Sequence, residues 1–142
     1  MSCACAYVPE GPTEGIFSVD ASAITFGRGA IREVGDLLRG LGSRRVAVFT
    51  DGRVAKLEFF APALRSLAGM EFDVYAECRV EPTDASFRAA AAFAREGRFD
   101  GYLSIGGGSV IDTCKAAQLL ATYPADLIPA QLRALRGSHA GR

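Results

Sequence analysis

The stretch Tyr102-Leu103-Ser104-Ile105-Gly106-Gly107-Gly108-Ser109-Val110-Ile111-Asp112 decides how this 142-residue chain folds. Its first four residues predict a buried strand, and the segment from Val110 to about Thr122 predicts a helix. The glycine-rich turn Gly106–Ser109 joins the two. Glycine lets a backbone approach a ligand closely, and a helix N-terminus offers unpaired N–H groups that suit a phosphate. We therefore expect this turn to bind phosphate, and a tight turn without a ligand is the alternative.

The pattern around the turn separates it from two better-known phosphate loops. It departs from Gly-x-Gly-x-x-Gly because the third glycine position falls at Ile111, and it lacks the Gly-Lys-Ser/Thr of nucleoside triphosphatases. Ser109 is expected to cap the helix, with Asp112 three residues later completing a capping box. Asp112 is then a structural brace rather than a catalyst.

Strands and helices alternate on the N-terminal side of this stretch. Strands are predicted at 45–50 and 72–75, and two shorter strand-like runs lie at 16–19 and 24–26. Helical spacing of apolar residues is found in three segments: Ile31, Val34, Leu37, Leu38 and Leu41; Leu57, Phe60, Leu64 and Leu67; Phe87, Ala90, Ala91 and Ala94. Gly42 and Gly97 are expected to end the first and third helices, and Thr83 or Asp84 to cap the third. The alternation predicts an α/β fold with a mainly parallel sheet and helices on both faces.

A second turn of interest follows the strand at 45–50. Asp51 and Gly106–Ser109 both stand after predicted strands, and ligands of parallel sheets bind beyond the carboxyl ends of the strands. The two turns should therefore share one edge of the sheet. The Asp51 carboxylate can accept hydrogen bonds from a ribose, although an Asp-Gly turn is more often only a turn.

The composition excludes several classes of partner. Sixteen Lys and Arg balance sixteen Asp and Glu, which argues against nucleic acid or an anionic membrane, and no apolar run reaches the roughly 20 residues of a membrane span. The first residues lack the charges of a signal or transit peptide, so we expect a cytoplasmic protein. Cys3, Cys5, Cys78 and Cys114 are expected to be reduced thiols. His139, the one histidine, is expected to be exposed and idle.

Three regions are expected along the chain. They are a flexible leader (1–15), a dinucleotide-binding α/β domain (16–126) and a divergent tail (127–142). The middle region carries every motif of interest.

Several motifs in that middle region resemble the iron-containing (group III) alcohol dehydrogenases. They are Phe26-Gly27-Arg28-Gly29, Thr50-Asp51, Val80-Glu81-Pro82-Thr83-Asp84 and, most specifically, Gly106-Gly107-Gly108-Ser109-Val110-Ile111-Asp112-Thr113-Cys114-Lys115-Ala116-Ala117. The form Arg-Val-Glu-Pro-Thr-Asp is similar to the hydroxyacid-oxoacid transhydrogenase branch.

The resemblance implies the N-terminal half of a dehydroquinate synthase-like fold that binds NAD. It places Asp51 on the adenosine ribose and Gly107, Gly108 and Ser109 on the pyrophosphate, with Gly106 opening the same turn. For the branch it implies hydride transfer between 4-hydroxybutyrate and 2-oxoglutarate, small molecules, through bound NAD. A homo-oligomer of the full-length form is left open.

In that family an Asp and three His in a C-terminal helical domain bind iron or another divalent metal. No such domain follows in this sequence, so we assign the chain no catalytic and no metal-ligating residue and expect it to be inactive alone. An inactive remnant and a stand-alone nucleotide-binding module are the alternatives. A flavodoxin-like phosphate binder is a third, which requires the motif matches to be accidental.

Overall fold

The computed structural model of the chain describes residues 24–123. Three parallel strands form its sheet in the order β2-β1-β3: β1 (Arg45–Phe49), β2 (Glu71–Tyr75) and β3 (Gly101–Ser104). The central strand sets the register, because Val46 lies opposite Phe72 of β2 and opposite Gly101 of β3. The predicted parallel sheet is confirmed.

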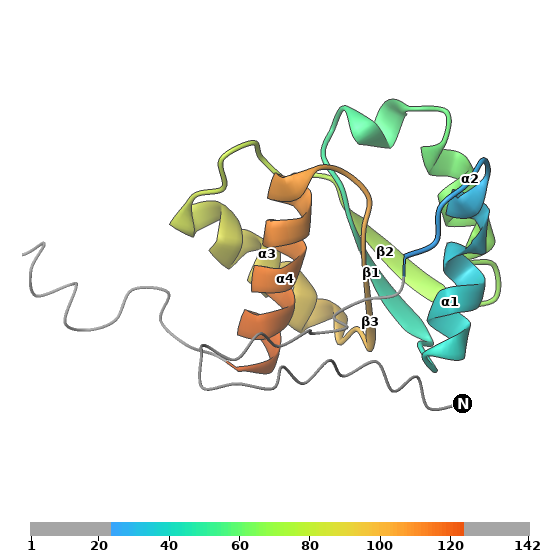
Figure 1. Cartoon of the computed structure of the whole chain (residues 1–142). Helices are drawn as coiled ribbons and strands as arrows, with labels where there is room; N and C mark the ends of the chain where they lie inside the picture. The colour runs from blue at the N-terminus through green and yellow to red at the C-terminus, as the bar shows by residue number, and fades with distance from the viewer. Residues whose placement is uncertain (1–23, 124–142) are drawn as a thin grey trace, which may run out of the picture. The chain divides into compact units, whose positions relative to one another are not determined.

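The connections between the strands are helical. The described helices are η1 (Ala30–Glu33), α1 (Val34–Gly40), η2 (Val54–Lys56), α2 (Phe60–Ser66), α3 (Asp84–Gly97) and α4 (Gly108–Thr122). Figure 1 shows α1 and α2 against one face of the sheet and α3 and α4 against the other. Helices therefore cover both faces, as the alternating pattern predicted.

The buried side chains of β1 divide the core into two clusters. Val46 and Val48 point to one face and pack with side chains from the α1–α2 layer and the strand ends: Leu38, Phe60, Ala63, Leu67 and Ile105. Ala47 and Phe49 point to the other face and pack with side chains from the α3–α4 layer and nearby loops: Cys78, Ala90, Ala94, Phe99, Val110, Cys114 and Ala117. Because successive side chains of a strand alternate between faces, a strand covered on both sides must be apolar throughout. This explains the uninterrupted apolar run of β1.

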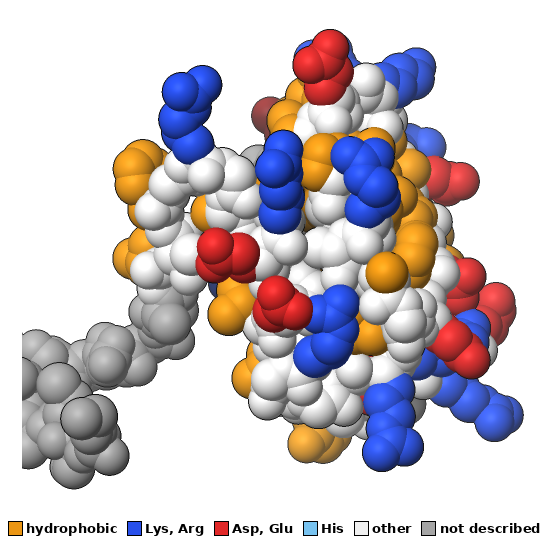
Figure 2. All heavy atoms as spheres, turned by 90° about the vertical axis from the view of Figure 1, so that its right-hand side faces the viewer, with side chains coloured by type: hydrophobic (Ala, Val, Ile, Leu, Met, Phe, Trp, Pro, Cys, Tyr) orange, Lys and Arg blue, Asp and Glu red, His pale blue; other side chains and the backbone are white. Residues whose placement is uncertain are grey.

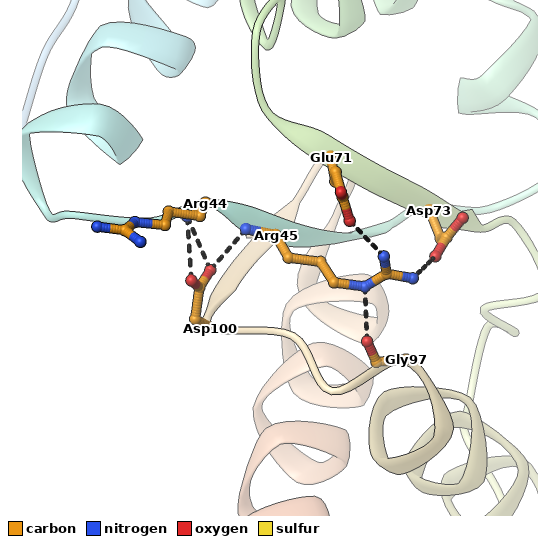
Figure 3. A network of polar contacts seen from close by, with 6 residues as sticks. All are labelled: Arg44, Arg45, Glu71, Asp73, Gly97 and Asp100. Atoms are coloured by element: carbon orange, nitrogen blue, oxygen red, sulfur yellow. Dashed lines mark hydrogen bonds and ion pairs between the residues drawn. The ribbon is translucent and has the colours of Figure 1, made fainter.

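A polar network fixes the amino ends of the strands (Figure 3). The Asp100 carboxylate accepts hydrogen bonds from the backbone N–H groups of Arg44 (2.9 Å) and Arg45 (2.8 Å). The Arg45 guanidinium binds Glu71 and Asp73 of β2 and donates to the carbonyl oxygen of Gly97 at 2.7 Å. The start of β1 is therefore tied to β2 and to the loop that precedes β3. Sequence reasoning did not identify this network.

Some sequence-based predictions of local structure were wrong. Ile24–Phe26 forms no strand, and both Ile24 and Phe26 are almost fully exposed. An apolar run this short becomes a strand only where a neighbouring strand supplies hydrogen bonds, and the three-stranded sheet contains none of these residues. Leu57 lies before α2 and is 48% exposed, so it does not belong to the apolar stripe of that helix.

The C-terminal end of α3 differs from the prediction by one residue. Gly97 is still helical, and Arg98 adopts the left-handed conformation (φ 49°) that was expected of the glycine. Glycine is needed at 97 for space, because a Cβ there would lie 2.0 Å from the Phe99 ring. The predictions for 1–15, 16–19, 127–142, Cys3, Cys5 and His139 lie outside the described residues.

The described surface carries both basic and acidic side chains. Basic and acidic side chains are interspersed with apolar ones over the face on which α1 and α2 lie (Figure 2). Within residues 24–123 no helix is both long and apolar enough to span a membrane.

Candidate functional site

The loops that follow the three strands line one cleft at the carboxyl edge of the sheet. Its empty volume is about 320 Å³. The residues that line it are Asp51 after β1, Cys78, Arg79 and Val80 after β2, and Gly107, Gly108, Ser109 and Val110 after β3. The two turns selected from the sequence therefore lie together, as the shared-edge argument predicted.

One buried residue holds the three loops in place. The backbone N–H of Thr50 donates to the carbonyl oxygen of Tyr75 at 2.9 Å, and its own carbonyl oxygen accepts from the N–H of Cys78 at 3.2 Å. Its hydroxyl donates to the carbonyl oxygen of Ile105 at 2.9 Å. Because Thr50 is fully buried, these bonds are sheltered from water. They fix the positions of Asp51, of the β2 loop and of the glycine turn relative to one another.

The glycine turn enters α4 earlier than predicted. Gly107 is the N-cap residue, with extended backbone (φ −85°, ψ −171°), and the helix begins at Gly108. Ser109 is therefore already helical and caps nothing, and no side chain caps this helix. The predicted capping box of Ser109 and Asp112 is wrong. With Gly107 at the cap, the third helical position is Val110, so Asp112 stands two residues too late to complete a box.

The three glycines of the turn differ in what they accommodate. A Cβ on Gly106 would lie 2.6 Å from Cγ2 of Val110, so the fold itself requires glycine there. A Cβ on Gly107 or Gly108 would meet no atom within 4 Å. Both of these line the cleft, and the packing of the chain does not explain why they lack side chains. The space above them, at the N-terminus of a 15-residue helix, suits a phosphate group.

The two carboxylate oxygens of Asp51 differ in their hydrogen bonds. Its Oδ1 accepts hydrogen bonds from the backbone N–H groups of Arg53 (2.8 Å) and Val54 (2.9 Å). These bonds, that of Val54 first, lower the pKa of Asp51 below its usual value, so the group is ionised at neutral pH. Oδ2 makes no hydrogen bond within residues 24–123. The residue is thus a turn former, as the simpler interpretation held, and it lines the cleft with one carboxylate oxygen left without a partner in residues 24–123.

Sequence reasoning missed the contribution of the loop after β2. Arg79 and Cys78 line the cleft, and Arg79 is exposed. Their position after the carboxyl end of a predicted parallel strand was the signal that could have identified them. Burial raises the pKa of the Cys78 thiol to about 11 and that of Cys114 to about 12, so neither is a thiolate at neutral pH.

The described residues do not fit a metal site. No group of three or more His, Cys, Asp or Glu side chains in residues 24–123 is arranged to hold a metal ion. Lys115 is exposed on α4 and does not line the cleft. What these residues offer is backbone N–H groups for an anion and one carboxylate oxygen for a hydroxyl.

The fold and the cleft place the chain in a class of dehydrogenases. The model of the family described as iron-containing alcohol dehydrogenase matches residues 21–139, and the chain belongs to this family. The crystal structure of the NADH-dependent butanol dehydrogenase A of Thermotoga maritima is similar to it with a TM-score of 0.75 and 28% identity, over 80% of this chain and 29% of that one. The predicted fold class and family are confirmed.

Curated relatives narrow the comparison to one branch. The mitochondrial hydroxyacid-oxoacid transhydrogenase of Homo sapiens is 44% identical over 119 residues, which are 82% of this chain and 26% of the relative. That of Xenopus tropicalis is 45% identical over 114 residues, 79% of this chain and 25% of the relative. The chain thus spans about a quarter of the length of the curated relatives it matches.

These relatives contradict the cytoplasmic localisation expected from the sequence. Their names place them in mitochondria. The expectation rested on the charges of the first residues. Import signals are read by receptors and are independent of the folded domain, so composition near one end of a sequence is a weak guide to the compartment.

Proposed function

We propose that residues 24–123 form the cofactor-binding part of an oxidoreductase that passes hydride between 4-hydroxybutyrate and 2-oxoglutarate through bound NAD. The relatives support the reaction type through their name, hydroxyacid-oxoacid transhydrogenase. The structural neighbour supports a nicotinamide cofactor through its name, NADH-dependent butanol dehydrogenase. The same relatives favour a mitochondrial location.

The open space above Gly107 and Gly108 carries the proposal. In it the pyrophosphate accepts hydrogen bonds from the backbone at the start of α4, including that of Ser109, while Gly106 shapes the turn. Oδ2 of Asp51 accepts a hydrogen bond from the ribose, since its other oxygen is already engaged. The chemistry of the bound nicotinamide is hydride transfer. Because residues 24–123 hold no metal-ligand cluster, the proposal gives them binding and orientation of the cofactor alone.

The substitution Gly108→Val tests the proposal. The added Cβ meets no atom of the folded chain within 4 Å, and the valine side chain occupies the space assigned to the phosphate, so we expect NAD affinity to fall at least about tenfold, the loss of a charge-assisted hydrogen bond or more. Calorimetric titration of NAD into the full chain measures this, after the thermal unfolding of each variant has been recorded.

Gly40→Val is the matched control. Gly40 ends α1, on the side of the sheet where the strands begin, and a Cβ there also meets no atom within 4 Å. This variant should bind NAD as the wild type does. A folded Gly108→Val that binds NAD with wild-type affinity would show that the glycine turn is structural only.

A further inference from the structure

Arg79 stands at the boundary of two hollows. It lines the cleft with Gly107 and Gly108, and it also lines a neighbouring hollow of about 400 Å³ beside the N-terminus of α3. The other residues of that second hollow are Tyr75, Glu77, Thr83, Ala85, Ser86 and Ala89. A side chain at this boundary lies within reach of any ligand that extends from the glycine turn towards β2.

Its guanidinium is available for such a ligand. Within residues 24–123 Arg79 makes no hydrogen bond and no ion pair, whereas Arg45 at the opposite edge of the sheet binds two carboxylates and a carbonyl oxygen. Fixing a free, exposed arginine costs side-chain entropy, and a doubly hydrogen-bonded anion offsets that cost better than a single contact does.

The charges of the cleft favour a cation of this kind. Of the described residues that line the cleft, Asp51 is negative and Arg79 alone is positive. A pyrophosphate brings about two further negative charges close to the Asp51 carboxylate. Backbone N–H groups at a helix N-terminus contribute only about half a unit of positive charge. A guanidinium adds a full positive charge and can bind two phosphate oxygens with its planar fork.

We infer that Arg79 binds the pyrophosphate of the dinucleotide together with the N-terminus of α4. The inference rests on the proposed function, because it takes the ligand of the cleft to be a dinucleotide. It commits to the pyrophosphate rather than to the additional 2′-phosphate of NADP. A third phosphate on the ribose would lie against the Asp51 carboxylate. The attraction of Arg79 would then have to exceed the repulsion between these two negative groups.

Titrations of ADP-ribose and NADP into the full chain test the inference, with three substitutions. Arg79→Gln should weaken ADP-ribose binding about tenfold. Arg79→Lys keeps the charge but loses the planar fork, so its affinity for ADP-ribose should lie between those of the wild type and Arg79→Gln. Arg65→Gln is the matched control, because Arg65 is exposed in the last turn of α2, at the edge of the sheet where the strands begin. It should leave the affinity for ADP-ribose unchanged.

The other possible outcomes contradict either the inference about Arg79 or the proposed function. If Arg79→Gln binds ADP-ribose as Arg65→Gln does while Gly108→Val still weakens binding, Arg79 has no role and the proposed function stands. If Arg79→Gln weakens NADP much more than ADP-ribose, the side chain serves the 2′-phosphate and the inference is wrong. If the folded wild type binds neither NAD nor ADP-ribose, the proposed function fails and the inference fails with it.

Discussion

A methyl group added to Gly106 would lie 2.6 Å from Cγ2 and 2.9 Å from Cβ of Val110, closer than carbon atoms approach. Val110 is buried in the cluster between the sheet and α3–α4, so its side chain has little freedom to move away. We expect Gly106→Ala to lower the free energy of unfolding by about 1–3 kcal/mol, the usual cost of overpacking. Urea denaturation measures it.

Gly107→Ala provides the comparison for that change. Its backbone lies in a region open to any residue, and the added methyl group meets no atom. This variant should unfold at nearly the wild-type urea concentration. Equal destabilisation by both substitutions would show that the turn as a whole, and not the contact with Val110, requires glycine.

Single residues also show where sequence reasoning reaches its limit. The glycine turn and Asp51 could be selected because each follows a strand that local periodicity reveals. Arg79 also follows a predicted strand, but four residues beyond its end, so that only the path of the loop after β2 brings it to the cleft. The same holds for Asp100, whose hydrogen bonds join positions 55 and 56 residues apart along the chain.

At the scale of the helices, α3 and α4 begin in different ways. The Thr83 hydroxyl accepts a hydrogen bond from the N–H of Ser86 at 3.2 Å, and the Ser86 hydroxyl accepts one from the N–H of Thr83 at 2.8 Å. This is a complete capping box. Helix α4 has no side-chain cap at all, which leaves the N–H groups of its first turn open to a ligand.

Because only α3 has a side-chain cap, replacing the hydroxyl residue near the start of each helix by alanine should affect stability differently. Thr83→Ala removes a cap and should lower the free energy of unfolding by about 1 kcal/mol. Ser109→Ala removes no hydrogen bond of the described chain and should change it by less than about 0.5 kcal/mol. Thermal and urea unfolding of both variants compare them. A larger loss for Ser109→Ala would mean that this side chain supports the helix after all.

Helix boundaries were harder to predict than helix existence. The periodicity of α1, α3 and α4 was visible in the sequence, but the first residue of α4 was not. Ser109 followed by Asp112 and Thr83 followed by Ser86 both have the spacing of a capping box, and only the first pair ends in an acidic residue. The structure uses the second pair, with Thr83 at the cap as one of the two residues that the sequence offered for it. A run of glycines, in contrast, lets the chain enter a helix at more than one point.

For the whole molecule, the amino-edge network makes stability depend on pH. Two backbone N–H groups, that of Arg45 first, hold the pKa of Asp100 below the usual 3.8. Such a group contributes its full stabilisation above the pKa of the unfolded chain and loses it as the pH falls through the lower pKa of the folded chain. Asp100→Asn should therefore unfold at lower urea than the wild type at pH 7, and the difference should shrink below pH 3.8.

Urea midpoints of both proteins from pH 7 to pH 2.5 measure this dependence. Glu58→Gln is the control for the loss of a charge, because Glu58 is exposed and accepts no hydrogen bond within the described chain. It should follow the wild type over the whole range. A constant difference between Asp100→Asn and the wild type at every pH would attribute the effect of Asp100 to shape and not to its charge.

The position of Thr50 separates the parts of each loop that must stay from the parts that can change. Its hydrogen bonds hold Cys78 and Ile105, and in each loop a residue that lines the cleft stands one or two positions beyond an anchored one: Asp51 after Thr50, Arg79 after Cys78 and Gly107 after Ile105. Each loop thus has an anchored residue followed by residues that line the cleft, and among the latter Asp51 also holds its own turn through Oδ1. A substitution at Arg79 or Gly107 alters what the cleft recognises without disturbing the sheet, so ligand preference can diverge among related chains while the scaffold is inherited intact.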